Sequence, residues 1–178
     1  MTGALTLARW LALPCHLFAR LCGLLLLVLT AVILYDVIGR RFFATGSFKL
    51  QELEWHLHGA IAILAFGYAY LRDAHVRIDI FAHRMTARFR LKLELAAILL
   101  FLVPFMALLL WFGWDFTWRS FTRGEGSAGG IGLPHRWIIK SAIPATAVLT
   151  MLGGLAVALR CWVALRRPDL LSDPFERT

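Results

Sequence analysis

The chain has 178 residues, of which 60% are hydrophobic, and it carries a formal net charge of +8. Soluble domains are about 45–50% apolar, and the excess here is gathered in long uncharged runs, which argues against a soluble domain. The cations flank those runs instead of lining one face of a soluble fold. This arrangement argues against a nucleic-acid partner and is typical of topology signals and contacts with anionic phospholipids.

Four segments are long and apolar enough to cross a membrane. A hydrocarbon core of about 30 Å needs roughly 20 helical residues, and open strands would leave backbone groups unsatisfied in lipid. The sequence therefore predicts an all-α membrane protein, with residues 1–178 forming a single membrane domain. The four transmembrane helices are expected at about 21–38, 53–71, 95–114 and 138–159.

The first predicted helix follows Arg9 and Arg20, and no small-residue cleavage site follows it, so we expect it to be retained. Asp36 lies near its far end, and Arg40 stands one turn later. Residues four apart on a helix are neighbours. This spacing indicates a structural ion pair more than a proton relay.

Polar residues cluster where the second predicted helix begins, at Glu52, Glu54, Trp55, His56 and His58. Each carboxylate has a histidine four residues later, but the two pairs point to different sides of a helix, so one shared metal site is not expected. Haem would need histidines on facing helices at one depth, and acid–base catalysis would need a converging third group. We therefore predict no metal, no cofactor and no catalytic residue.

The remaining role for this cluster is contact. Ionisable groups at a helix end are costly unless they are wetted or paired. Glu52 and Glu54 are expected either to lie in the headgroup layer or to meet Lys49 or a basic group of a partner.

The loop after the second predicted helix has an amphipathic pattern. On a helical wheel, one stripe is apolar and consists of Ile78, Phe81, Met85 and Phe89. The adjacent stripe is cationic and consists of Arg77, Arg84 and Arg88. The opposite side is polar and includes Asp79. The pattern predicts a short interfacial helix at about 76–90, whose arginines reach lipid phosphates. The alternative is a solvated connector.

The loop between the third and fourth predicted helices is rich in glycine, but no Gly-Lys-Ser/Thr sequence makes it a phosphate loop. Four tryptophans bracket it, which is typical of an aromatic belt at a membrane interface: Trp111, Trp114, Trp118 and Trp137. Lys and Arg residues are more numerous in the termini and the middle loop than in the other two loops. The positive-inside rule therefore predicts that both termini are cytoplasmic.

Several motifs resemble the small membrane subunit of TRAP (tripartite ATP-independent periplasmic) transporters, from about Tyr35 to Leu159. The more specific ones are Glu-Leu-Glu-Trp-His at 52–56 and the run from Arg72 through His75-Val76-Arg77-Ile78-Asp79 to Phe81. The resemblance continues in Leu102-Val103-Pro104-Phe105, Glu125-Gly126-Ser127, Gly132-Leu133-Pro134 and the stretch 137–144. It is nearest to the mannitol/chloroaromatic-type branch, or more loosely to the oxo-acid and monocarboxylate branch.

The resemblance implies a non-catalytic scaffold subunit in the bacterial inner membrane. A separate large membrane subunit would hold the sodium and substrate sites and move as an elevator, while a periplasmic binding protein would deliver an organic acid. Residues expected to contact a partner or lipid are Glu52, Glu54, Trp55, His56, His75, Arg77, Asp79, Arg84 and Arg88. The alternatives are a haem-bearing membrane anchor of a redox complex and a stand-alone small channel.

Overall fold

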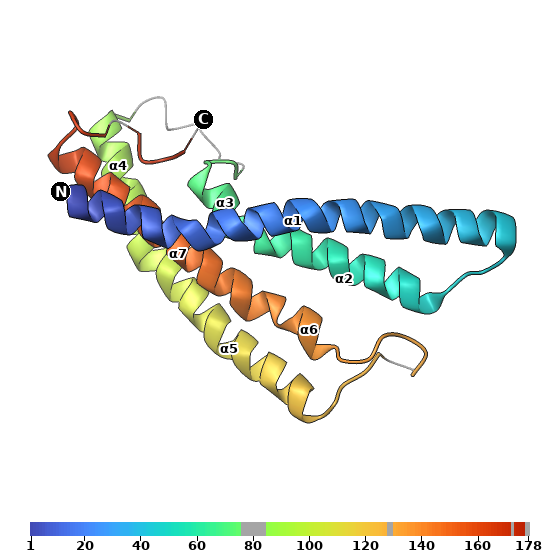
Figure 1. Cartoon of the computed structure of the whole chain (residues 1–178). Coiled ribbons are helices and arrows are strands. Elements are labelled where there is room, and N and C mark those ends of the chain that lie inside the picture. The colour runs from blue at the N-terminus through green and yellow to red at the C-terminus, as the bar shows by residue number, and fades with distance from the viewer. Residues whose placement is uncertain (76–84, 128–129, 172, 177–178) are drawn as a thin grey trace.

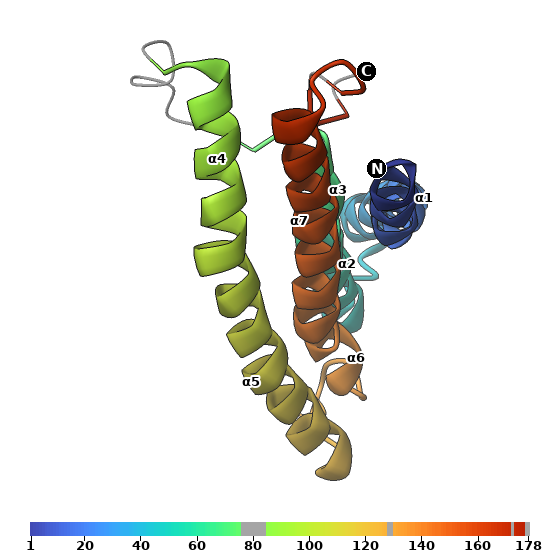
Figure 2. The same cartoon turned by 90° about the vertical axis from the view of Figure 1, so that its left-hand side faces the viewer.

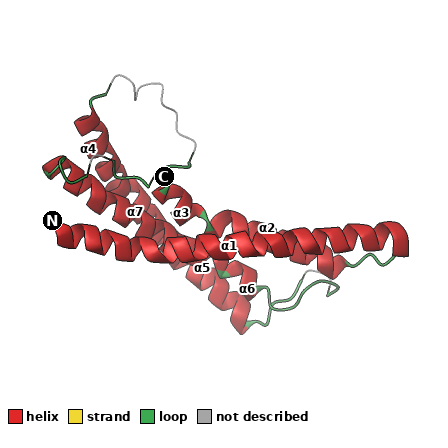
Figure 3. Cartoon of the chain, turned by 45° about the horizontal axis from the view of Figure 1, so that its top comes forward, coloured by secondary structure: helices red, strands yellow, loops and turns green. Residues whose placement is uncertain are grey.

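The computed structural model of the chain describes residues 1–75, 85–127, 130–171 and 173–176. Every regular element in these ranges is a helix (Figure 3), which confirms the predicted all-α class. In chain order the elements are α1 (Thr2–Phe43), α2 (Phe48–Leu64), α3 (Phe66–Leu71), α4 (Ala87–Ala97), the π-helical η2 (Ile98–Leu102), α5 (Val103–Thr122), α6 (Trp137–Lys140) and α7 (Ala142–Arg166).

The molecule has two distinct ends (Figure 1). The start of α1 and the tail after α7 lie at one, which we call the terminal end. The turn between α1 and α2 (residues 44–47) and the loop between α5 and α6 (residues 123–127 and 130–136) lie at the other, which we call the loop end. The start of α1 and the tail therefore lie on the same side of the bundle.

Helix α7 is the centre of the bundle. It lies between α4 and α5 on one side and α1, α2 and α3 on the other (Figure 2). In the most apolar window of the helix that ends at Arg166, 61% of residues are buried, against 11% for α1 and 6% for the helix from Ala87 to Thr122. The outer helices therefore present most of their apolar side chains outward.

Two adjacent glycines of α7 allow close packing on both sides. A Cβ on Gly153 would lie 2.7 Å from the Gly67 carbonyl oxygen in α3, and a Cβ on Gly154 would lie 2.7 Å from Leu102 Cδ2 in η2. Small residues at helix crossings let backbones approach, which is how helices associate in membranes. Cys15 of α1 joins the same contact, because its thiol donates to the Leu149 carbonyl at 3.2 Å.

Helix α1 is much longer than the predicted span 21–38. Its 42 residues extend about 63 Å at 1.5 Å per residue, which is twice the thickness of a hydrocarbon core. Buried positions recur every seven residues along it, at Ala8, Cys15, Cys22, Leu29 and Asp36. A seven-residue repeat keeps one seam of a helix against its neighbours. Packing along this seam stabilises the part of the helix that contains Arg9 and Arg20.

The second predicted span, 53–71, is divided at Ala65 into α2 and α3. Just before the break, the Ile63 carbonyl accepts a hydrogen bond from the Thr146 hydroxyl of α7. Gly67, just after it, lies against α7. Three described helices are long and apolar enough on their own to cross a membrane, and this pair is the fourth expected crossing in two pieces.

The third predicted span, 95–114, belongs to a longer helix that starts at Ala87 and runs through η2 to Thr122. Thr86 begins it, because its hydroxyl accepts from the Phe89 amide at 3.3 Å. Residues 87–90 of the predicted interfacial helix therefore belong to α4. Residues 76–84 lie outside the described ranges. The fourth predicted span, 138–159, corresponds to α6 and α7.

Candidate functional site: a carboxylate-centred cluster at the loop end

Glu52 joins helix α2 to the loop between α5 and α6. Its side chain projects from the start of α2 and only 8% of the residue is exposed. Its Oε2 accepts a 2.6 Å hydrogen bond from the Leu133 backbone amide, and Ser127 hydrogen-bonds the same carboxylate. His56 lies one turn along α2, with its Nε2 3.9 Å from Glu52 Oε1. The carboxylate therefore holds two parts of the loop on the second helix.

The loop approaches Glu52 so closely that only glycine fits at residue 132. A Cβ there would lie 2.5 Å from the Ser127 Cβ and closer still to Glu52 Oε2. The loop is also bonded to itself, because the Ser127 amide donates to the Leu133 carbonyl at 3.1 Å. The absence of a side chain at Gly132 therefore allows the loop to contact Glu52 of α2.

Glu125 forms the second anchor of the loop. Its backbone carbonyl accepts from the Arg136 amide at 3.0 Å, and its carboxylate accepts from Lys140 of α6. That hydrogen bond holds the pKa of the Glu125 carboxyl below its ordinary value. The Lys140 ammonium also lies 4.0 Å above the Phe116 ring of α5. The loop therefore ties α5 and α6 together as well as α2.

The ion pair expected between Asp36 and Arg40 is present near the end of α1. Asp36 is 1% exposed, and its Oδ1 has no hydrogen-bond partner in the part of the chain that the structure describes. The turn that follows is closed by the Thr45 amide, which donates to the Gly39 carbonyl at 3.2 Å. This pair stabilises the start of the loop end.

The residues expected to make contacts are not gathered in one place. Glu52 and His56 share the cluster, Glu54 beside them is half-buried, and Trp55 is exposed. Glu52 meets the loop of its own chain, and a contact of Glu52 or Glu54 with a partner or with lipid stays a prediction. No group of three or more possible metal-binding side chains occurs among the described residues.

The other expected contact residues lie far from Glu52 or beyond what the structure describes. His75 is exposed at the terminal end, with its Nε2 3.4 Å from the Phe66 carbonyl. Arg88 is exposed in the first turn of α4. Arg77, Asp79 and Arg84 fall outside the described ranges.

A second polar cluster, at the terminal end, was missed from the sequence. The Glu176 carboxylate in the tail pairs with Arg160 of α7 and with His16 of α1, whose Nε2 lies 2.9 Å away. The Glu176 amide donates to the Leu71 carbonyl of α3 at 2.9 Å. Arg160 inside an apolar helix was the available signal, because a buried cation needs a partner.

Each cluster connects helices of this chain with a loop or with the tail, through hydrogen bonds and ion pairs within that cluster. The sequence places this assembly in a known family. The chain matches the family described as tripartite ATP-independent periplasmic transporters, DctQ component, over residues 29–164, which is more than half of its length.

A search of curated proteins finds no match for the chain. The redox-anchor and channel alternatives receive no support from the family match. The matched region holds the motifs that form the loop-end cluster, from Glu52 to Lys140. The chain belongs to the DctQ family and is the small membrane subunit of a TRAP transporter.

Proposed function

We propose that this chain is the non-catalytic scaffold of a sodium-coupled TRAP transporter for an organic acid. It braces the large, elevator-type membrane subunit, and a periplasmic binding protein delivers the substrate. The observation that carries the proposal is the internal use of polar groups. Glu52, Glu125 and Glu176 bond to other parts of this chain and hold its helices around α7.

The outward faces suit a brace in the membrane. The helix from Ala87 to Thr122 and α1 bury few residues of their apolar windows, and many large apolar and aromatic side chains of both helices are exposed between the charged residues near their ends. Such surfaces pack against lipid or against another membrane protein. Moving substrate would need polar groups at mid-depth, whereas the uncharged window of 95–114 has none.

The topology in this proposal follows from the shared position of the start of α1 and the tail. Both lie at the terminal end, and the count of cations favours the cytoplasm for that end. The loop-end cluster then faces the periplasm, in the bacterial inner membrane, where a binding protein approaches. His75 and Arg88 then lie near the cytoplasmic phospholipids.

Deleting this chain tests the role. Cells that retain the large subunit and the binding protein should lose sodium-dependent uptake of the transported acid, while the binding protein should keep its affinity for it. The large subunit should also become less stable in the membrane, measured as its yield after extraction. Full-rate uptake without this chain would contradict the bracing role.

A further inference from the structure

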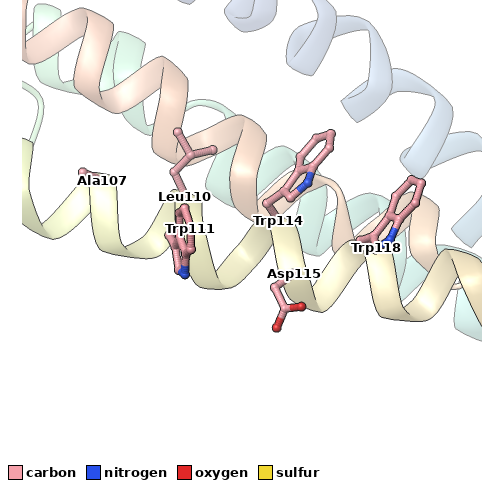
Figure 4. A pocket seen from close by; sticks show the side chains of 6 residues that line it. All are labelled: Ala107, Leu110, Trp111, Trp114, Asp115 and Trp118. Atoms are coloured by element: carbon pink, nitrogen blue, oxygen red, sulfur yellow. The ribbon is translucent and has the colours of Figure 1, made fainter.

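A shallow groove runs along the outward face of α5. Its volume is about 600 Å³, and its lining residues all come from this one helix (Figure 4): Ala107, Leu110, Trp111, Trp114, Asp115 and Trp118. The three tryptophans are more than half exposed, and Trp111 reaches 75%. Gly113 and Ser120, which are buried, lie on the opposite side of the helix. The groove therefore faces away from the bundle.

The depth of the groove is given by the charges that bound it. No charged residue occurs from Leu95 to Trp114, a length of about 30 Å in a helix, and Asp115 is the first charge after it. Asp115 therefore lies where hydrocarbon gives way to headgroups. Tryptophans are enriched at this level because the ring prefers the apolar side and the indole N–H needs a polar partner.

The polar edge of the groove carries both signs of charge. The Asp115 carboxylate pairs with Arg119 one turn later, and the two side chains are 47% and 61% exposed. An ion pair turned toward lipid is costly unless polar groups surround it. A zwitterionic headgroup supplies those groups, because its ammonium complements a carboxylate and its phosphate complements a guanidinium.

We propose that this groove binds an aminophospholipid of the phosphatidylethanolamine type. The acyl chain lies along Ala107, Leu110 and Trp111. The primary ammonium donates hydrogen bonds to Asp115, and the phosphate accepts from Arg119 and an indole N–H. The site selects ethanolamine over choline, because a quaternary ammonium has no N–H to donate. It also gives a purely anionic headgroup no advantage, because the Asp115–Arg119 pair has no net charge. This inference does not depend on the transport role.

Lipid binding to the purified complex of this chain with its large subunit tests the proposal. Native mass spectrometry would compare phosphatidylethanolamine, phosphatidylcholine and phosphatidylglycerol with identical acyl chains. We expect the ethanolamine lipid to bind about ten- to a hundredfold more tightly than the choline lipid, as one charge-assisted hydrogen bond would give. Asp115→Asn should remove that preference, because an amide carries no charge to attract the ammonium.

Asp169→Asn is the matched control, since Asp169 also pairs with an arginine on an exposed surface, Arg167, but beyond the end of α7. It should leave the preference unchanged. Equal binding of the three lipids, a stronger phosphatidylglycerol signal, or a preference that survives Asp115→Asn would overturn the proposal. The last result is also the one expected if the large subunit covers this face.

Discussion

The Leu133 backbone amide donates a 2.6 Å hydrogen bond to the Glu52 carboxylate, although 81 positions of sequence separate the two residues. This contact joins the two hairpins of the molecule. The first hairpin is α1 with α2, and the second is the long helix ending in α5 with α6 and α7. The contact therefore fixes the position of the α5–α6 loop relative to α2 at the loop end.

Gly132→Ala should destabilise the chain by about 1–3 kcal/mol, the usual cost of overpacking a filled site. The added Cβ would press on Glu52 and Ser127. The measurement is thermal unfolding in detergent, followed by a maleimide dye that reacts with the buried thiols of Cys15, Cys22 and Cys161 as they become exposed. Gly126→Ala is the control, since nothing lies within 4 Å of its Cβ position. Equal melting temperatures for both variants would contradict the close packing of the loop against Glu52.

Gly153→Ala should lower stability by a similar ~1–3 kcal/mol, because its Cβ would meet the Gly67 carbonyl in the crossing of α3 and α7. Gly59→Ala, at an open position of α2, should be neutral or slightly stabilising, since alanine favours a helix. The same unfolding assay separates them. A Gly153→Ala protein as stable as the Gly59→Ala protein would show that the crossing is loosely packed.

The contribution of Glu125 should depend on pH. Lys140 lowers the pKa of this carboxyl in the folded chain, so its stabilisation is fully present above the ordinary glutamate value of about 4.3 and disappears as pH falls through the lower folded value. The melting temperature of the wild type should therefore exceed that of Glu125→Gln at pH 7, and the gap should shrink as the pH falls below about 4.3. Tryptophan fluorescence reports both transitions. A gap independent of pH would exclude this contact as its source.

Orientation is tested by single added cysteines, because the three native thiols are buried. Gly126→Cys, at the loop end, should react with an impermeant maleimide added to intact spheroplasts. Thr2→Cys, at the terminal end, should react only after the membrane is opened. The reverse pattern would place the termini in the periplasm and contradict the orientation given by the cation count.

Hydropathy located the crossings but not their ends. Arg9 and Arg20 appeared to mark the limit of the first helix, yet the seam of buried residues carries α1 across both to Thr2. The residues around Ala65 did not signal the break. The contacts beside it are with α7, which is distant in sequence: the Ile63 carbonyl accepts from Thr146, and Gly67 lies against Leu149. Helix ends in this chain follow tertiary packing more than composition.

The candidate site was partly visible in the sequence. Glu52 stood out as a polar residue at the start of a predicted helix, and Asp36 and Arg40 were paired correctly because the two lie on one helix. The partner of Glu52 was not found, since a backbone amide has no side-chain signature. The ion pair of Arg160 with Glu176 was not predicted for a related reason, because it depends on where the tail folds back onto α7.

The bracing role is tested most directly by sodium-driven uptake into proteoliposomes that contain the large subunit and the binding protein, with and without this chain. The account predicts no uptake in its absence, full uptake with the wild type or Gly126→Ala, and a reduced rate with Gly132→Ala at equal protein content. Equal rates with and without this chain would contradict the account.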